Sequence, residues 1–266
     1  MSLTSTTPVR VNWRALRVAP VLAPLVVGVV LLGLWEWAVG HFDVQPFVLP
    51  APSLIAEKVT GTPDVIWDAS VFTGTNALLG LALGAVLGVL AAVVASLAKP
   101  LELMASPVVL IASVIPIVSL APIFYTWFGS GVNTGRVMVA ALAAGIPVYL
   151  NTLRGLSMVA PVHTELMTAY HASAWQRATT VTLPTALPYV FTGLRIASSL
   201  AVISALIAEY FGGPSGGLGK AITNSVASSN APLAWAYVFG SIVLGLVFYL
   251  VTLLVELWFT RHRTTT

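Results

Sequence analysis

Six long apolar runs, separated by more polar segments, dominate the pattern along the chain. Each run is long enough to cross a bilayer as a helix, which needs about 20 mostly apolar residues. The expected spans are 19–40, 72–98, 103–128, 136–156, 187–210 and 233–259. The pattern therefore predicts an all-α membrane protein with six transmembrane helices. They form one domain, 19–260, between an N-terminal segment 1–18 and a tail 261–266.

The first apolar run has a competing interpretation as a secretory signal peptide, with Ala38-Val39-Gly40 as a cleavage site. Its apolar core is longer than the usual signal core of about 7–15 residues, and five more spans follow. We therefore favour a retained first span.

Composition supports a membrane protein and excludes several chemistries. The chain is 58% hydrophobic and 8% charged, whereas soluble domains carry about 25% charged residues. It contains no cysteine, so disulfides and thiolate metal sites are excluded. The net charge of +3 is small and dispersed, which gives no reason to expect nucleic-acid binding.

The polar segment 161–188 interrupts the apolar runs and has helical periodicity of its own. Pro161 suits a first helical turn, and Ser173 can N-cap a second short helix. Apolar residues recur on one face of each helix at Val162, Leu166, Ala169, and at Trp175, Ala178, Val181. Leu183-Pro184 should then end the second helix. The pattern predicts a knob of two short helices outside the membrane.

Basic residues gather on one side of the predicted membrane. That side holds Arg10, Arg14, Arg17, Lys99, Arg154, Arg177, Arg261 and Arg263, and the other holds Lys58, Lys220 and Arg136. Because positive loops stay in the cytoplasm, both termini and the knob are expected there.

The remaining polar segments are predicted to be connections. Residues 41–71 form an outer loop in which Ser53 caps a short surface helix. Lys99-Pro100 makes a tight turn, and residues 211–232 form a second outer loop.

Small residues recur every fourth position in the second span, at Gly80, Gly84, Gly88, Ala92 and Ser96. Such a stripe lets two helix backbones approach closely in lipid. We favour packing against another span of the same chain, and a seam between two copies is the alternative.

Two features of the spans are candidates for the transport pathway. Pro107, Pro116 and Pro122 interrupt the third span, and broken helices often line such pathways; simple kinked packing is an equal alternative. Glu209 lies toward the outer end of the fifth span. It either lines the pathway or reaches the interface and is solvated, and we favour solvation.

Catalytic motifs are missing from the sequence. Gly219-Lys220 imitates the end of a phosphate-binding loop, but Pro214 stands at the required Gly and Ala221 replaces Ser or Thr. The four histidines lack the spacing of a metalloenzyme. The chain is therefore expected to hydrolyse no ATP and to bind no cofactor or metal.

Several motifs together resemble the coupling loop of ABC-importer inner-membrane permeases of the nitrate/sulfonate/taurine type. The family pattern is Glu-Ala-Ala, three residues, Gly, nine residues, Ile-x-Leu-Pro. Counting back from Leu183-Pro184 puts the family's Glu at Glu165, whereas His171 replaces the family's Gly. Further matching stretches are Ala172-Ser173-Ala174-Trp175, Ala186-Leu187-Pro188, Gly193-Leu194-Arg195, Leu49-Pro50-Ala51-Pro52-Ser53 and Gly216-Gly217-Leu218-Gly219.

The resemblance implies a type I ABC-importer permease fold (MetI-like) with a cytoplasmic coupling loop at 161–185. The implied ATPase-coupling residues are Glu165, His171, Ala172, Ser173, Ala174, Trp175, Leu183 and Pro184. It also implies two separate ATPase subunits, an extracytoplasmic binding protein and a permease homodimer in the bacterial inner membrane. The solute would be nitrate, a sulfonate, taurine or a thiamine-precursor pyrimidine.

An ion-coupled secondary carrier is the alternative function, and a membrane enzyme is a distant third. Such carriers usually place ionisable groups near the membrane midplane. The spans 72–98, 103–128, 136–156 and 233–259 contain none away from their ends. No inverted repeat is evident either. We therefore favour the importer.

Overall fold

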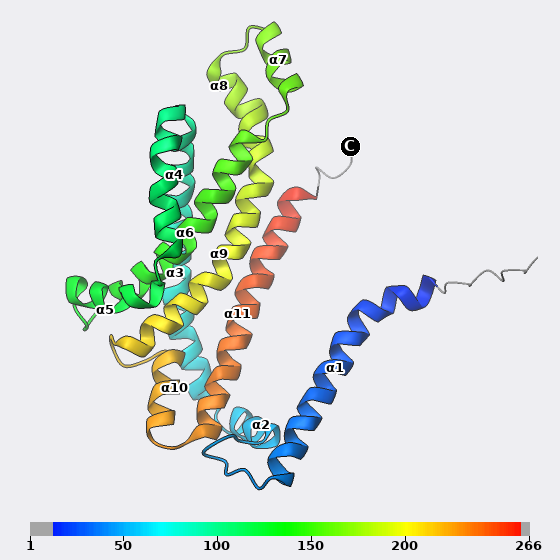
Figure 1. The fold of residues 1–266 in the computed structure, drawn as a ribbon, viewed down its shortest axis with the longest axis vertical. Coiled ribbons are helices and arrows are strands. Elements are labelled where there is room, and N and C mark those ends of the chain that lie inside the picture. Colours follow the sequence, from blue (N-terminus) through cyan, green and yellow to red (C-terminus); the bar gives the residue numbers. More distant parts are fainter. Residues whose placement is uncertain (1–12, 262–266) are drawn as a thin grey trace, which may run out of the picture.

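The computed structural model describes residues 13–261, and all regular elements in this part of the chain are helices (Figure 1). Its elements are α1 (Trp13–His41), α2 (Pro52–Gly61), α3 (Pro63–Ser96), α4 (Lys99–Val114), α5 (Ile117–Phe128), α6 (Thr134–Ser157), α7 (Pro161–Ala169), α8 (Ala174–Arg177), the π-helical turn η1 (Ala178–Thr182), α9 (Leu183–Phe211), α10 (Leu218–Ala227) and α11 (Ala231–Thr260). Most of the predicted segment 1–18 and of the tail 261–266 lies outside the described residues.

The described helices include five that are long and apolar enough to cross a membrane, and a bent pair supplies a sixth. The five are α1 from Leu22, α3, α6, the continuous helix Ala174–Phe211 and α11. The all-α fold with six candidate spans is thus confirmed. The knob of α7 and α8 lies at one end of the molecule, and α2 and α10 lie at the opposite end (Figure 1).

The third predicted span, 103–128, is divided into two helices. Helices α4 and α5 meet at 103°, and Ile115 and Pro116 between them are extended. Proline disfavours helical backbone in the residue before it, which explains a break at Ile115. Pro107 and Pro122 stay inside helices, so proline alone does not locate the break.

Helices α3, α6 and α9 form the centre of the molecule, and the small-residue stripe lies between α3 and α6. A Cβ added at Gly88 would stand 2.7 Å from the carbonyl oxygen of Gly145, and Gly80 and Gly84 are equally close to α6. Ala92 is also buried, whereas Ser96 is exposed. The stripe therefore packs within the chain, as favoured from the sequence, and Ser96 is not part of it.

Helix α1 stands apart from the other helices and touches them near its outer end (Figure 1). The Trp35 and Trp235 rings meet edge to face at 5.3 Å. Glu36 accepts hydrogen bonds from the Ser53 amide at 3.0 Å and hydroxyl at 2.7 Å. The prediction that Ser53 caps α2 is wrong, because Ala51 is the N-cap and the Ser53 hydroxyl binds Glu36 instead.

The three predicted connections, 41–71, Lys99-Pro100 and 211–232, each contain part of a helix. Helix α3 begins at Pro63, and Lys99-Pro100 opens α4 because proline fits a first helical turn. The predicted loop 211–232 contains α10, which packs against α11 and α3 through Leu218, Ala221 and Ile222. These apolar residues recur at i, i+3 and i+4, which is the periodicity of a helix face.

Candidate functional site

The knob has the two-helix form predicted from the sequence. Ser173 caps α8: its hydroxyl accepts the Gln176 amide at 3.2 Å, and the Gln176 side chain accepts the Ser173 amide at 2.8 Å. This reciprocal capping box satisfies amides that a four-residue helix cannot satisfy itself. The predicted cap at Ser173 is therefore confirmed.

His171 makes the bend between the two helices in a left-handed conformation, with φ +50°. The His171 amide donates to Thr168 at 3.0 Å, and the Ala172 amide donates to Met167 at 2.9 Å. These two bonds form a Schellman motif, whose left-handed position is usually Gly because a Cβ costs about 1–2 kcal/mol there. The chain keeps the sharp bend at the family's Gly position and carries the strain of a histidine there.

The second predicted helix does not stop at Leu183-Pro184. It continues from α8 through η1 into α9, so the predicted end is wrong. The Leu183 amide donates to Ala178 five residues back, and this wider turn directly precedes Pro184. Proline has no N–H for the helical ladder, and a π turn before it lets the helix resume in a new register.

The knob exposes a row of large apolar side chains. Val162, Leu166 and Tyr170 follow one another at i, i+4 and i+8, with 63%, 49% and 78% of their surface exposed. Trp175 across the bend is 74% exposed. Glu165 lies on the same short helix and is exposed as well. Exposed large apolar side chains beyond the membrane-spanning helices are typical of an interaction site.

The two small residues of the bend lie beside this row. Ala172 is partly buried, and Ala174 in the first turn of α8 is exposed. Neither side chain would obstruct another surface from approaching the backbone of the bend. The structure thus brings together the predicted coupling residues of α7, the bend and α8, with Leu183 and Pro184 one to two turns beyond.

The predicted pathway residues Pro116 and Pro122 are exposed and lie on either side of the start of α5. Pro116 is the N-cap of α5, and Pro122 is inside that helix. Figure 1 shows α5 turning sharply out of the direction of α4 at the lower end of that helix. Their role in the pathway stays a prediction.

Glu209, the third pathway candidate, is fully buried near the end of α9. Its carboxylate accepts hydrogen bonds from the Thr73 hydroxyl at 3.0 Å and from the Gly219 amide at 2.8 Å. The favoured interpretation, a solvated side chain at the interface, is wrong. The carboxylate faces the first amides of α10, where the helix dipole favours negative charge.

Arg136 is also fully buried, although the sequence analysis counted it among the basic residues of the outer side. Its guanidinium donates to the carbonyl oxygens of Gly212 at 3.2 Å and Pro214 at 2.6 Å. It lies 5.1 Å from the centre of the Phe72 ring. The sequence carried no signal for this role, because the partners are backbone carbonyls 76 and 78 residues away.

A third polar group joins α9 to α11 nearer the knob. Arg195 and Glu256 form an ion pair at 3.1 Å, and the Thr192 hydroxyl donates to Glu256 at 3.0 Å. One turn further, Ser198 and Thr252 share a hydrogen bond of 3.1 Å. These contacts fix how the two helices lie against each other.

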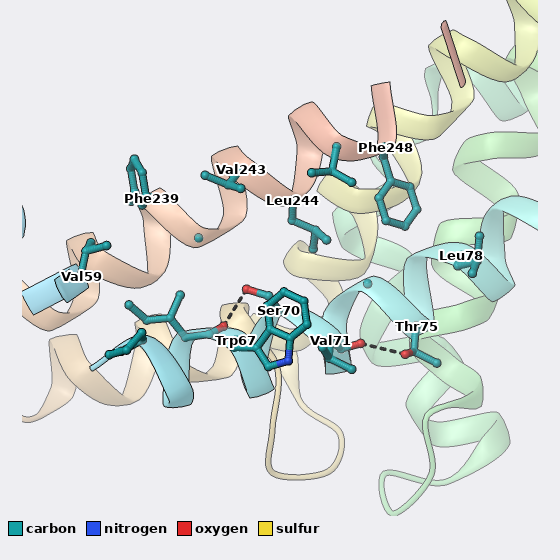
Figure 2. Close-up of a pocket in the computed structure, with 15 residues that line it drawn as sticks. Val59, Trp67, Ser70, Val71, Thr75, Leu78, Phe239, Val243, Leu244 and Phe248 are labelled. Carbon is teal, nitrogen blue, oxygen red and sulfur yellow. Dashed lines mark hydrogen bonds between the residues drawn. The ribbon is translucent and has the colours of Figure 1, made fainter. Parts of the chain in front are cut away.

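A groove of about 490 Å³ opens between α3 and α11 (Figure 2). Trp67, Val71 and Val243 are among its largely apolar lining residues. Its two hydroxyls bond within α3, Ser70 to Ile66 at 2.6 Å and Thr75 to Val71 at 2.8 Å. The groove therefore suits hydrocarbon and offers little to a polar solute.

No group of three or more His, Asp or Glu side chains within residues 13–261 could hold a metal ion.

The chain is similar in sequence to known proteins. Residues 84–263 match the family described as "Binding-protein-dependent transport system inner membrane component". The formylaminopyrimidine transport permease protein ThiX of Halalkalibacterium halodurans is 31% identical over 228 residues, covering 85% of this chain and 90% of that protein. The putative aliphatic sulfonates transport permease protein SsuC of Bacillus subtilis is 29% identical, covering 72% and 70%.

A solved structure shares the fold at low sequence identity. The crystal structure of an amino acid ABC transporter with histidines aligns with a TM-score of 0.63 and 18% identity, covering 76% of this chain and 97% of that one.

Proposed function

The chain belongs to the family of binding-protein-dependent transport system inner membrane components, and on that premise we propose that α7 and α8 couple it to ATPase subunits. It is an ABC-importer permease subunit for a small solute, embedded in the inner membrane. Such permeases work with an ATPase and a binding protein. Two ATPase subunits and a homodimer of this chain are the assembly that we propose.

One observation carries the coupling proposal: the exposed apolar row Val162, Leu166 and Tyr170 lies outside the span bundle, beside the bend. A short helix gains little stability in water by itself. Its apolar face is best explained by a groove on a partner, which is a common mode of helix recognition. ATP-driven closure of the two ATPases would draw the two knobs together and rock the spans.

The proposal makes the chain itself non-catalytic, with ATP hydrolysed by the partner. The glycine-rich segment before α10 lies at the end of the molecule opposite the knob (Figure 1). The Gly219 amide at the start of α10 already binds a carboxylate, that of Glu209. This supports the view that the Gly219-Lys220 segment is not a nucleotide site.

The charges support a cytoplasmic knob and cytoplasmic termini. Arg154, Arg177 and Arg261 lie at or near the knob ends of their helices, and Lys58 and Lys220 belong to α2 and α10 at the other end. This arrangement follows the positive-inside rule. Arg136 no longer counts in this balance, because it is buried and bound to backbone.

The experiment that tests coupling is an arginine substitution in the bend. Ala174 is exposed in the free permease, so Ala174→Arg should leave insertion and folding unchanged. In the docked state the same charge would be buried without a partner. An uncompensated buried charge costs about 3–5 kcal/mol. We expect the variant to insert normally but to lose both ATPase co-purification and ATP-dependent uptake.

Two further variants serve as matched controls. Thr60→Arg places the same side chain on exposed α2 at the opposite end and should co-purify with the ATPase like the parent. His171→Gly, which restores the family residue, should also retain coupling. If Ala174→Arg still binds the ATPase and supports uptake at the parental rate, the docking assignment is wrong.

The solute is proposed to be a sulfonate, taurine, nitrate or a pyrimidine precursor of thiamine, the classes suggested by the resemblance. Its identity is read from the ligand of the cognate binding protein. ATP-dependent uptake by the reconstituted importer, assayed with each of these solutes, tests the choice. Uptake without any ATPase would instead favour the secondary carrier.

A further inference from the structure

The segment 212–217, which joins α9 to α10, is held in place more tightly than its sequence suggests. Four of its residues are glycines with positive φ, at Gly212, Gly213, Gly216 and Gly217. Glycine allows many backbone conformations, so such a link would be free to vary by itself. Arg136 instead binds the segment itself, and Glu209 binds the first turn of the helix that follows it.

Arg136 of α6 binds the carbonyl side of the segment. Its guanidinium reaches Gly212 and Pro214 and lies over the Phe72 ring of α3. A Cβ at Gly213 would stand 2.9 Å from the Arg136 Nε, so only glycine lets the guanidinium approach this closely.

Glu209 of α9 binds the amide side at the start of α10, and Thr73 of α3 completes the contact. The Thr73 hydroxyl donates to Glu209 and accepts the Leu218 amide at 2.8 Å. Glu209 itself accepts the Gly219 amide. Arg136 thus holds the carbonyls before α10, and Thr73 and Glu209 hold the first amides of α10.

A buried charge near a membrane is costly and needs a specific use. We propose that Thr73, Arg136 and Glu209 form a clamp that fixes α10 to the outer ends of α3, α6 and α9. The clamp makes these ends one rigid unit, so motion driven at the knob cannot release α10 alone. These are positioning residues, and the inference rests on the proposed importer function.

The decisive variants change Thr73, which is uncharged and central to the clamp. Thr73→Val keeps the shape and removes the hydroxyl, and Thr73→Ser keeps the hydroxyl. Thr75→Val is the matched control, because the exposed Thr75 hydroxyl bonds only to its own helix. Glu209→Gln is the stronger perturbation, since it removes the buried charge.

Two measurements on the reconstituted importer test whether the clamp holds α10 in place. Ser225 is buried in α10, and Ser225→Cys in this cysteine-free chain reports its opening to an impermeant maleimide. We expect labelling to be at least about tenfold faster in Thr73→Val and Glu209→Gln, because local opening exposes the helix. Solute imported per ATP hydrolysed should fall several-fold, whereas Thr73→Ser and Thr75→Val should match the parent.

The ratio of transport to ATP separates positioning from simple stability, because a lower amount of folded protein leaves the ratio unchanged. Equal labelling and equal ratios in Thr73→Val and Thr73→Ser would overturn the clamp, even if Glu209→Gln failed to fold. A parent complex that shows no ATP-dependent uptake would instead overturn the proposed function.

Discussion

Replacing Gly84 by alanine tests one of the close contacts between α3 and α6 in the centre of the molecule. A Cβ at this position would stand 2.9 Å from the Gly145 amide nitrogen and 3.0 Å from the Ala144 Cβ, and closer still to the Ala141 carbonyl oxygen. Two of these three atoms belong to the backbone of α6, which cannot move as a side-chain tip can. The substitution therefore forces α3 and α6 apart.

Overpacking of this kind costs about 1–3 kcal/mol. For a chain of this size, each kcal/mol lowers the melting temperature by about 2–4 °C. We therefore expect Gly84→Ala to melt about 2–12 °C below the parent in detergent, and Gly84→Leu to melt lower still. Thermal unfolding of the purified permease, followed by tryptophan fluorescence, measures both shifts.

The control is Gly33→Ala, the same substitution at a glycine with open space around it. A Cβ at Gly33 of α1 meets no atom within 4 Å. Alanine is the better helix former by about 1 kcal/mol, so Gly33→Ala should leave the melting temperature unchanged or raise it. A Gly84→Ala variant that melts with or above Gly33→Ala would refute the close packing of the two helices.

Three other predictions concern the knob and the topology. His171→Gly relieves left-handed strain of about 1–2 kcal/mol but loses about 0.5–1 to backbone entropy, so stability should rise by about 0.5–1 kcal/mol; thermal unfolding with His171→Ala as a strained control checks this. Ser173→Ala removes the cap of α8 at a cost of about 1 kcal/mol, and faster hydrogen exchange confined to the knob would show it, whereas unchanged exchange would contradict the cap. Cysteines at Lys220 and Arg177 should be labelled from opposite sides of the membrane by an impermeant reagent, and labelling of both from one side would contradict the proposed topology.

Much of the fold could be predicted because length and periodicity are local signals. The apolar runs located the spans, and the Ser173 cap followed from residue type and position, since a capping box needs only four neighbouring residues. Helix α10 was missed although its apolar spacing was present, because the surrounding Gly, Ser and Asn suggested a loop.

The buried charges could not be predicted because their partners are distant in sequence. Glu209 accepts a hydrogen bond from Thr73, which is 136 residues away. Arg136 binds backbone carbonyls, and these give no sign in the sequence that they are its partners. The sequence argument against a carrier rested on four spans, 72–98, 103–128, 136–156 and 233–259, which hold no charged residue away from their ends. Arg195 and Glu209 lie in the fifth span, where Arg195 pairs with Glu256 and Glu209 is bonded to Thr73 and Gly219.

The uninterrupted path from α8 through η1 to the end of α9 gives the molecule a long lever. The continuous helix Ala174–Phe211 has 38 residues, which corresponds to about 57 Å at 1.5 Å per residue. A tilt of about 5° pivoting at its knob end would carry the far end sideways by about 5 Å, roughly one helical pitch. A small change in the tilt of this helix at the knob is thus converted into a displacement of several ångströms at its far end, and bending at the wide turn η1 or at Pro188 would reduce that displacement.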